Sequence, residues 1–255
     1  MKSSEFITEV KDYQHESISI EKAVALLNEH CRESLATIHA PLWRGMRDHF
    51  GEVVTIDPTT GLRKSANTSN YYTLLIDNSP YFEGWPKRSK SLICSTWHRY
   101  ASDYGRLYAI FPFDGVKIAV CHSKDIWETQ VNIPELGIHT SGPDSMRRFN
   151  QYLYRIGFPQ SWHGIVKAAK SEATQKSLRL NVLIALQDRI PSPDNVLPTL
   201  LAGMAPELTK FKLMSIAEFA AEPPQNKECW VGGPVVAIRK DIYEKFLDAV
   251  QQGAV

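Results

Sequence analysis

Short motifs for the common metal and nucleotide sites are absent from this sequence. The four cysteines, Cys31, Cys94, Cys121 and Cys229, form no CxxC pair, and none of the eight histidines belongs to an HxxxH or HExxH pattern. Both absences argue against a zinc site. GxGxxG and GxxxxGK are also absent, so a Gly-rich phosphate loop of the usual kinds is not expected. We expect the cysteines to be small buried side chains of a reduced protein that holds no metal ion.

The chain also lacks a strong net charge and long hydrophobic runs. Lys and Arg number 29 against 28 Asp and Glu, which leaves a net charge of +1. This balance argues against a basic coat for nucleic acid but allows a local basic patch. No run approaches the roughly 20 apolar residues that a membrane-spanning helix needs, and the first ten residues are polar and charged, unlike a secretory signal peptide. These features predict a cytoplasmic protein that makes no membrane contact.

Size and composition are those of an ordinary globular protein. The 255 residues are 43% hydrophobic and 22% charged, close to the averages of globular domains. At roughly 150 residues per domain, the length allows one large domain or two small ones. The sequence shows no internal repeat and no low-complexity segment.

The first half of the chain predicts a helix followed by short strands. Ser17 or Ser19 can cap a helix that runs to about Leu35, because apolar residues recur at 3–4 residue spacing along it. Asp114-Gly115 separates two apolar runs, and such a pair predicts a β-hairpin. The apolar runs of this hairpin are 107–113 and 116–121, further short strands are expected at 36–43, 51–56 and 91–96, and a short helix ends the stretch 65–78.

The second half of the chain changes to a helical pattern. Asp144 can cap a helix that Gly157 ends. Further helical periods occur at 166–187 and 197–221, residues 229–238 return to strand composition, and 241–250 predict a final helix. The expected fold class is therefore α+β. We expect a single domain over residues 1–255, with an N-terminal helix and a large, mainly helical insertion at about 128–222 that splits a sheet.

Arg44 is the first of three candidate functional positions beside short strands. It follows an apolar strand and precedes Gly45, so its planar guanidinium could meet a phosphate at close backbone range. A surface arginine at a strand end has the same local sequence.

Hydroxyl side chains surround the strand expected at residues 91–96. Ser89, Ser91, Ser95 and Thr96 could hold a ribose or orient a carboxylate through hydrogen bonds. The basic run just before this strand, PKRSK, could approach phosphates. Ordinary strand hydroxyls behind a solvated basic rim give the same pattern.

Glu228 stands immediately before the strand expected at 229–238. A carboxylate in this place can stabilise the positive charge that develops on a ribose ring as a glycosidic bond breaks. A charged residue that merely caps a strand has the same sequence context.

The order of these three stretches resembles the R-S-E group of mono-ADP-ribosyltransferases. The phrases LWRGM, PKRSKSLICST and KECW are most similar to the members encoded by tailed bacteriophages, which modify host proteins. The likeness covers about residues 37–127 and 225–240. It implies an ADP-ribosyltransferase-like split β-sandwich that binds NAD+ in a cleft.

The resemblance also assigns roles to particular residues. Arg44 would bind the NAD+ phosphates, and Glu228 would be the catalytic glutamate. Ser95 and Thr96 match the first two positions of the family's Ser-Thr-Ser, and Trp97 replaces the last serine. The Trp97 ring is one of several aromatic groups that could stack on nicotinamide or adenine, with core packing as the alternative.

The sequence departs from the family pattern in two respects, and one assignment stays open. Glu228 follows Ser95 by 133 positions, which requires the helical insertion. Asn226 stands two residues before Glu228, where members that modify arginine or asparagine carry Glu or Gln, so the acceptor is left open. Ser89 or Ser91 is an alternative to Ser95 as the site hydroxyl.

The resemblance implies an enzyme that cleaves the nicotinamide–ribose bond of NAD+ and transfers ADP-ribose to a macromolecule. A host protein is the expected acceptor, and a nucleic acid is the alternative. NAD+ would be the substrate, and no general acid would be needed because the cationic nicotinamide leaves as a neutral molecule. No metal would be needed either, because an arginine, a hydroxyl and a glutamate would hold the pyrophosphate, orient the ribose and stabilise the developing cation. The protein would then act in the host cytoplasm or travel with the virion. Three other interpretations are kept: an inactive virion protein of the same fold, an NAD glycohydrolase, and a helical adaptor with accidental motifs.

Overall fold

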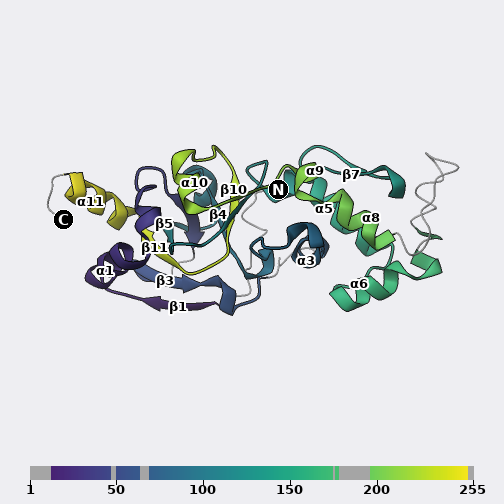
Figure 1. Cartoon of the computed structure of the whole chain (residues 1–255), viewed down its shortest axis with the longest axis horizontal. Coiled ribbons are helices and arrows are strands. Elements are labelled where there is room, and N and C mark those ends of the chain that lie inside the picture. The colour runs from purple at the N-terminus through teal and green to yellow at the C-terminus, as the bar shows by residue number, and fades with distance from the viewer. Residues whose placement is uncertain (1–12, 47–49, 64–68, 175, 178–195, 252–255) are drawn as a thin grey trace. The chain divides into compact units, whose positions relative to one another are not determined.

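A nine-stranded antiparallel sheet is the largest element of the structure. The computed structural model (Figure 1) describes residues 13–46, 50–63, 69–174, 176–177 and 196–251. Its mixture of helices and sheet confirms the expected α+β class. Within these residues the strand order is β1-β3-β11-β5-β2-β4-β10-β6-β9. The strands are β1 (Gln14–Ser17), β2 (Leu42–Met46), β3 (Val53–Asp57), β4 (Leu92–Ser95), β5 (Arg106–Pro112), β6 (Ile118–Val120), β9 (Lys212–Met214), β10 (Glu228–Val231) and β11 (Val235–Arg239).

The chain forms two units, and this sheet belongs to the first. Unit 1 is drawn from residues 1–64, 85–124 and 212–255, and unit 2 from residues 65–84 and 125–211. The helices of unit 1 are α1 (Ile20–His30), α2 (Arg32–Leu35), α4 (His98–Ser102), α10 (Ile216–Ala221) and α11 (Lys240–Gln251), with 3₁₀ turns η2 (Pro58–Thr60) and η4 (Arg88–Lys90). Every candidate site residue from the sequence lies in unit 1.

The large sheet consists of two parts that meet at one residue pair. β1, β3, β11, β5 and β2 form the first part, and β4, β10, β6 and β9 form the second. In the described register, β2 meets β4 where Trp43 lies opposite Ser95. By contrast, β2 pairs with β5 along all of Leu42–Met46. The β2–β4 joint is therefore the narrowest connection in the described sheet.

Both parts of the sheet contribute to one shared core. Tyr108 and Ile110 of β5 and Cys229 of β10 belong to this core. Because alternate residues of a strand face opposite sides of the sheet, Glu228 and Trp230 face away from it. The other buried members are Leu42, Met46, Val54, Ile56, Leu92, Cys94, Ile118, Val120, Ile216, Phe219, Val231, Val235 and Ala237.

Helices α1 and α11 contribute to a second buried cluster with the first part of the sheet. Leu27 of α1 and Tyr243 of α11 join Phe111 of β5 and Val236 of β11 in this cluster. These strand residues alternate with those of the shared core, so the two clusters lie on opposite faces of the sheet.

The N-terminal helix begins where the sequence predicts but ends earlier. Ser19 accepts a hydrogen bond from the Lys22 amide at 3.2 Å and so caps α1. The helix ends at His30, and Cys31 separates it from the short helix α2. The prediction of one helix to Leu35 is therefore wrong in its second half.

The hairpin predicted at Asp114-Gly115 is wrong. β5 pairs with β11 and β2, whereas β6 pairs with β10 and β9, so the strands on either side of the turn are not neighbours. The Asp114 carboxylate accepts hydrogen bonds from the amides of Arg32 and Glu33, at 3.2 and 2.8 Å. It therefore caps α2, a long-range contact that local sequence does not reveal, and the chain passes from one part of the sheet to the other.

Other strand predictions vary in accuracy. Strands at 51–56 and 91–96 are confirmed as β3 and β4, and the final helix is confirmed as α11. The strand expected at 36–43 begins only at Leu42, after a series of turns. The single strand expected at 229–238 is two strands, β10 and β11, separated by Gly232-Gly233-Pro234.

Unit 2 is mainly helical and carries its own two-stranded sheet. Its elements are α3 (Tyr71–Asn78), η3 (Pro80–Phe82), η5 (Ile126–Glu128), β7 (Val131–Ile133), η6 (Pro134–Leu136), β8 (Ile138–Thr140), α5 (Ser145–Arg155), α6 (Trp162–Ala169), α8 (Val196–Gly203) and α9 (Pro206–Thr209). The helix after Asp144 is confirmed as α5, but Asp144 has a φ of 69° and makes no capping hydrogen bond through its side chain. Gly157 beyond the end of α5 has a φ of 84°, which favours glycine.

The helical insertion differs from its predicted bounds of 128–222. Unit 2 also includes residues 65–84, so it is built from two segments of the chain. Residues 212–222 belong to unit 1, where β9 pairs with β6. The helical period predicted at 166–187 is described as α6 in its first part, and residues 178–195 lie outside the described residues.

All four cysteines are buried, as the sequence predicts. No helix in the described ranges has the length and apolar character to cross a membrane. The described His, Cys, Asp and Glu side chains do not gather in threes that could hold a metal ion.

Candidate functional site

The predicted catalytic residues lie on three neighbouring strands, β2, β4 and β10. Glu228, the first residue of β10, is directly opposite Ser95, the last residue of β4. Ser95 is also opposite Trp43 of β2, so Arg44 is next to the same joint. Residues directly opposite in antiparallel strands share a face, which places Ser95 and Glu228 on the same side of the sheet. Arg44 instead lies opposite Tyr108 of the shared core, so it is on the other side of the sheet and does not join them.

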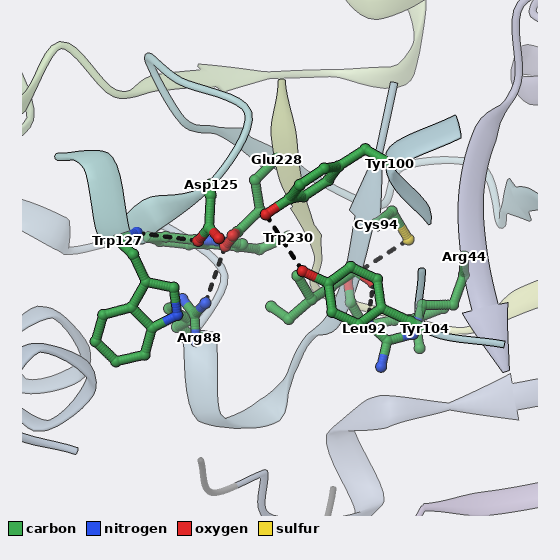
Figure 2. Close-up of polar contacts among 11 residues, drawn as sticks. Arg44, Arg88, Leu92, Cys94, Tyr100, Tyr104, Asp125, Trp127, Glu228 and Trp230 are labelled. Atoms are coloured by element: carbon green, nitrogen blue, oxygen red, sulfur yellow. Dashed lines mark hydrogen bonds and ion pairs between the residues drawn. The ribbon is translucent and has the colours of Figure 1, made fainter. Parts of the chain in front are cut away.

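The Glu228 carboxylate is buried and held by two donors. The residue is 6% exposed. Its Oε1 accepts hydrogen bonds from Arg88 Nη2 at 2.9 Å and from Trp230 Nε1 at 2.8 Å (Figure 2). Its backbone is fixed as well, because the Glu228 amide donates to the Ser123 carbonyl at 3.1 Å and the Glu228 carbonyl accepts from Cys121 at 2.8 Å. The two side-chain hydrogen bonds, one of them from a charged arginine, and the paired backbone therefore hold this carboxylate in one position.

Arg88 is a site residue that the sequence did not single out. It is 2% exposed, whereas Lys87 and Lys90 on either side of it are exposed. Its guanidinium carbon lies 5.4 Å from the centroid of the Trp230 ring, within the range of a cation–π contact. The basic run before β4 is therefore not exposed to solvent along its whole length, because Arg88 is buried within it. No local signal distinguishes this arginine from the lysines around it, because its ion pair with Glu228 joins positions far apart in sequence.

Arg44 bridges the joint between the two parts of the sheet. It is 6% exposed, and its Nη1 donates to the Ile93 carbonyl of β4 at 2.8 Å. Hydrogen bonds from charged groups contribute about 1.5–3 kcal/mol in such places. Arg44 therefore stabilises the β2–β4 joint.

Gly45 permits helix α4 to pack directly on β2. A Cβ atom at this position would lie 2.2 Å from the Ala101 carbonyl oxygen and 2.9 Å from the Cβ of Tyr104. The sequence suggested that the glycine lets a phosphate approach the backbone. In the structure, the close approach is made by the protein's own backbone at the end of α4.

Ser95 and Thr96 carry hydroxyls at the end of β4. Ser95 Oγ accepts a hydrogen bond from the Trp97 amide at 3.0 Å and so fixes the turn into α4. Thr96 Oγ1 accepts from the Lys227 amide at 2.8 Å. Both hydroxyls therefore hold the backbone beside Glu228.

The remaining candidates lie in different surroundings. Ser91 is fully buried, and its hydroxyl donates to the Lys87 carbonyl at 2.7 Å. Ser89, in η4, accepts through its carbonyl from the Arg63 amide at 2.7 Å. Trp97 is 37% exposed, so its ring is open to a ligand. Among the alternatives for the site hydroxyl, Ser95 is the one that lies opposite Glu228.

Cys229 is next to Glu228 but belongs to the shared core. It lies opposite Cys94 in the pairing of β10 with β4, and neither side chain is on the Glu228 face. Burial, followed by the nearby Cys94 and Glu228, raises the pKa of the Cys229 thiol well above its ordinary value. This thiol is therefore not an available nucleophile.

Comparisons with known proteins return no relative. No family model matches the chain, and no match was found among curated proteins or solved structures. The chemistry of the site therefore has to follow from its own groups. A buried carboxylate beside a hydroxyl on one face of the sheet is suited to stabilise a developing positive charge.

Proposed function

We propose that the protein is a mono-ADP-ribosyltransferase that cleaves the nicotinamide–ribose bond of NAD+ and transfers ADP-ribose to a macromolecular acceptor. The observation that carries this proposal is the register of β2, β4 and β10. Glu228 lies opposite Ser95, and Ser95 lies opposite the residue that precedes Arg44. Ser95 and Glu228 therefore share one face of the sheet although 133 positions separate them in the sequence, whereas Arg44, the third residue of the R-S-E pattern, lies opposite Tyr108 on the shared-core face.

The form of the sheet also supports the proposal. Two parts that meet at the Trp43–Ser95 pair and share one core are what a split β-sandwich requires. The R-S-E residues lie at or beside this division, with Arg44 on one part and both Ser95 and Glu228 on the other.

The proposed reaction needs little from the enzyme beyond placement and charge. Nicotinamide leaves as a neutral molecule, so no general acid is required, and the ribose passes through an oxocarbenium-like state. The Glu228 carboxylate would stabilise that cation and Ser95 would keep the strand end beside it in place, while Arg44 would hold the β2–β4 joint through its hydrogen bond to the Ile93 carbonyl. An acceptor nucleophile then forms the new bond to C1′ of the ribose and loses its proton.

The buried Arg88–Glu228 ion pair supports a second candidate function. A carboxylate that is neutralised by a guanidinium at 2.9 Å stabilises a neighbouring cation less than an isolated one does. A protein that keeps the sheet but does not cleave NAD+, such as a virion component, would tolerate this pairing. Nicotinamide release by the wild-type protein distinguishes the two candidates.

The test uses purified protein and two preparations of NAD+, labelled on nicotinamide or on adenosine. Release of labelled nicotinamide, together with adenosine label on precipitated host-lysate macromolecules, is the expected result. Protease and nuclease digestion of the product then identifies the acceptor class, with protein expected. Release of nicotinamide with only free ADP-ribose would replace transfer by hydrolysis. No release above buffer would favour the non-catalytic candidate.

Glu228→Gln is the variant that tests the catalytic assignment. It keeps size and hydrogen bonding but removes the charge, so nicotinamide release should fall by about 10²–10³-fold while NAD+ affinity changes little. Glu222→Gln makes the same change at an exposed position and should have no effect. Equal activity of the two variants would remove Glu228 from the mechanism.

A further inference from the structure

We propose that Arg88 is a positioning residue for the Glu228 carboxylate, an inference that rests on the proposed function. The R-S-E resemblance assigns no role to this arginine. Its part in the reaction would be to hold the catalytic oxygen atoms in one orientation, and it would not itself touch NAD+. Its burial to 2% exposed agrees with a role that acts through Glu228.

The contacts of Glu228 Oε1 show how this positioning works. Arg88 Nη2 and Trp230 Nε1 both donate to the same oxygen, at 2.9 and 2.8 Å (Figure 2). One donor alone would leave the carboxylate able to rotate about its hydrogen bond. Two donors from different directions fix both the oxygen and the plane of the carboxylate, as a preorganised catalytic group requires.

Trp230 contacts both members of the ion pair, Glu228 and Arg88. Its indole N–H holds the carboxylate, and its ring lies 5.4 Å from the Arg88 guanidinium carbon. Trp230 is 1% exposed and packed in the sheet, so it restricts the arginine and the glutamate together. Lysine could not reproduce this arrangement, because an ammonium lacks the planar fork and the stacking surface.

A buried ion pair generally contributes little net stability compared with apolar residues in the same place. A protein in which apolar residues of similar volume replace a buried ion pair is often equally stable or more stable, because removing two charges from water is costly. A buried arginine that meets the carboxylate of the proposed catalytic residue therefore suggests a requirement of function.

The experiment measures nicotinamide release against NAD+ concentration for the wild type, Arg88→Met, Arg88→Lys and Trp230→Phe. Arg88→Met should lower kcat by about 10²-fold, the loss that a misplacement near 1 Å produces, with KM for NAD+ changed less than about two-fold. Arg88→Lys should recover part of kcat, because it restores the charge and one donor. Trp230→Phe keeps an aromatic ring but removes the N–H, and should also lower kcat with little change in KM.

Arg239→Met is the matched control. Arg239 is also an ion-paired arginine of unit 1, bonded to Asp241 and Glu52, but it does not contact Glu228. This variant should keep wild-type kcat. Circular dichroism establishes whether each variant is folded. If Arg88→Met does not fold, the test rests on the two other variants, Arg88→Lys and Trp230→Phe.

The outcomes separate this inference from the proposed function. A wild type that releases no nicotinamide overturns both. An active wild type with unchanged kcat in Arg88→Met, or in both Arg88→Lys and Trp230→Phe, overturns only the role of Arg88. Equal losses in Arg88→Met and Arg239→Met would also overturn it, since the loss would then reflect general damage to unit 1.

Discussion

Thr96 and Lys227 are hydrogen-bonded to each other in both directions. The Thr96 amide donates to the Lys227 carbonyl at 2.9 Å, and the Lys227 amide donates to Thr96 Oγ1 at 2.8 Å. The pair closes the end of β4 against the start of β10, one residue beyond Ser95 and one before Glu228. It therefore fixes the backbone from which both proposed site residues project.

Thr96→Val tests this closure. Valine keeps the shape of threonine and its backbone amide but leaves the Lys227 amide without its hydroxyl acceptor, which should lower the free energy of unfolding by about 1–3 kcal/mol. Thr96→Ser keeps the acceptor and should cost less. Urea unfolding followed by circular dichroism measures both. A valine variant as stable as the wild type would show that the hydroxyl does not hold the strands together.

The Arg88–Glu228 pair should give a strongly non-additive mutant cycle. Arg88→Met leaves a buried carboxylate without its guanidinium, and the expected loss is about 3–5 kcal/mol. Adding Glu228→Gln removes the charge while its amide oxygen can still accept from Trp230, so the double variant should be more stable than Arg88→Met alone. Denaturant midpoints and slopes measure the cycle. Additive losses would mean that the two side chains do not interact in solution.

Gly45→Ala should destabilise unit 1 through a clash with α4. Its Cβ would lie 2.2 Å from the Ala101 carbonyl oxygen, and overpacking of this kind costs about 1–3 kcal/mol or more. Gly115→Ala is the control, because that position has a φ of 77° but no atom within 4 Å, so only backbone strain opposes the new methyl group. Thermal unfolding should show the larger loss for Gly45→Ala. A larger loss for Gly115→Ala would contradict the close packing of α4 on β2.

Cys31 should make the protein less stable in alkali. Burial, with a smaller effect of the Asp114 charge, raises the pKa of its thiol from 9.0 to about 12. The unfolded thiol ionises first as the pH rises, so the contribution of Cys31 is complete below pH 9 and is lost between pH 9 and 12, by about 1.4 kcal/mol per pH unit. Urea midpoints of the wild type should fall more between about pH 8 and about pH 10.5 than those of Cys31→Ala. Parallel curves would show that this thiol titrates normally.

Local features of the fold could be predicted from the sequence because local contacts determine them. Ser19 caps α1 through an amide three residues away, and Gly157 follows α5 with the positive φ that glycine allows. The strand at 91–96 was recognisable from its apolar residues and became β4. In each case the partners lie within one turn or one strand.

Features that depend on distant partners could not be predicted in the same way. Asp114-Gly115 has the sequence of a hairpin turn, but the amides of α2 take the Asp114 carboxylate. Arg88 has the sequence of a solvated basic run, but Glu228 and Trp230 bury it. At the candidate site, the likeness to the R-S-E pattern named Arg44, Ser95 and Glu228, while the ion pair that holds the glutamate emerged only from the three-dimensional structure.

The place of β10 and β11 in the sheet has a consequence for protein synthesis. A ribosome completes these two strands last, yet β10 inserts between β4 and β6, and β11 between β3 and β5. Until they emerge, β3, β5, β4 and β6 each have one edge without its hydrogen-bonding partner. Such unpaired strand edges are templates for aggregation. The carboxylate of Glu228 arrives with the same segment. A translation product that stops before residue 228 would therefore lack both the interior of its sheet and the charge proposed to act on NAD+.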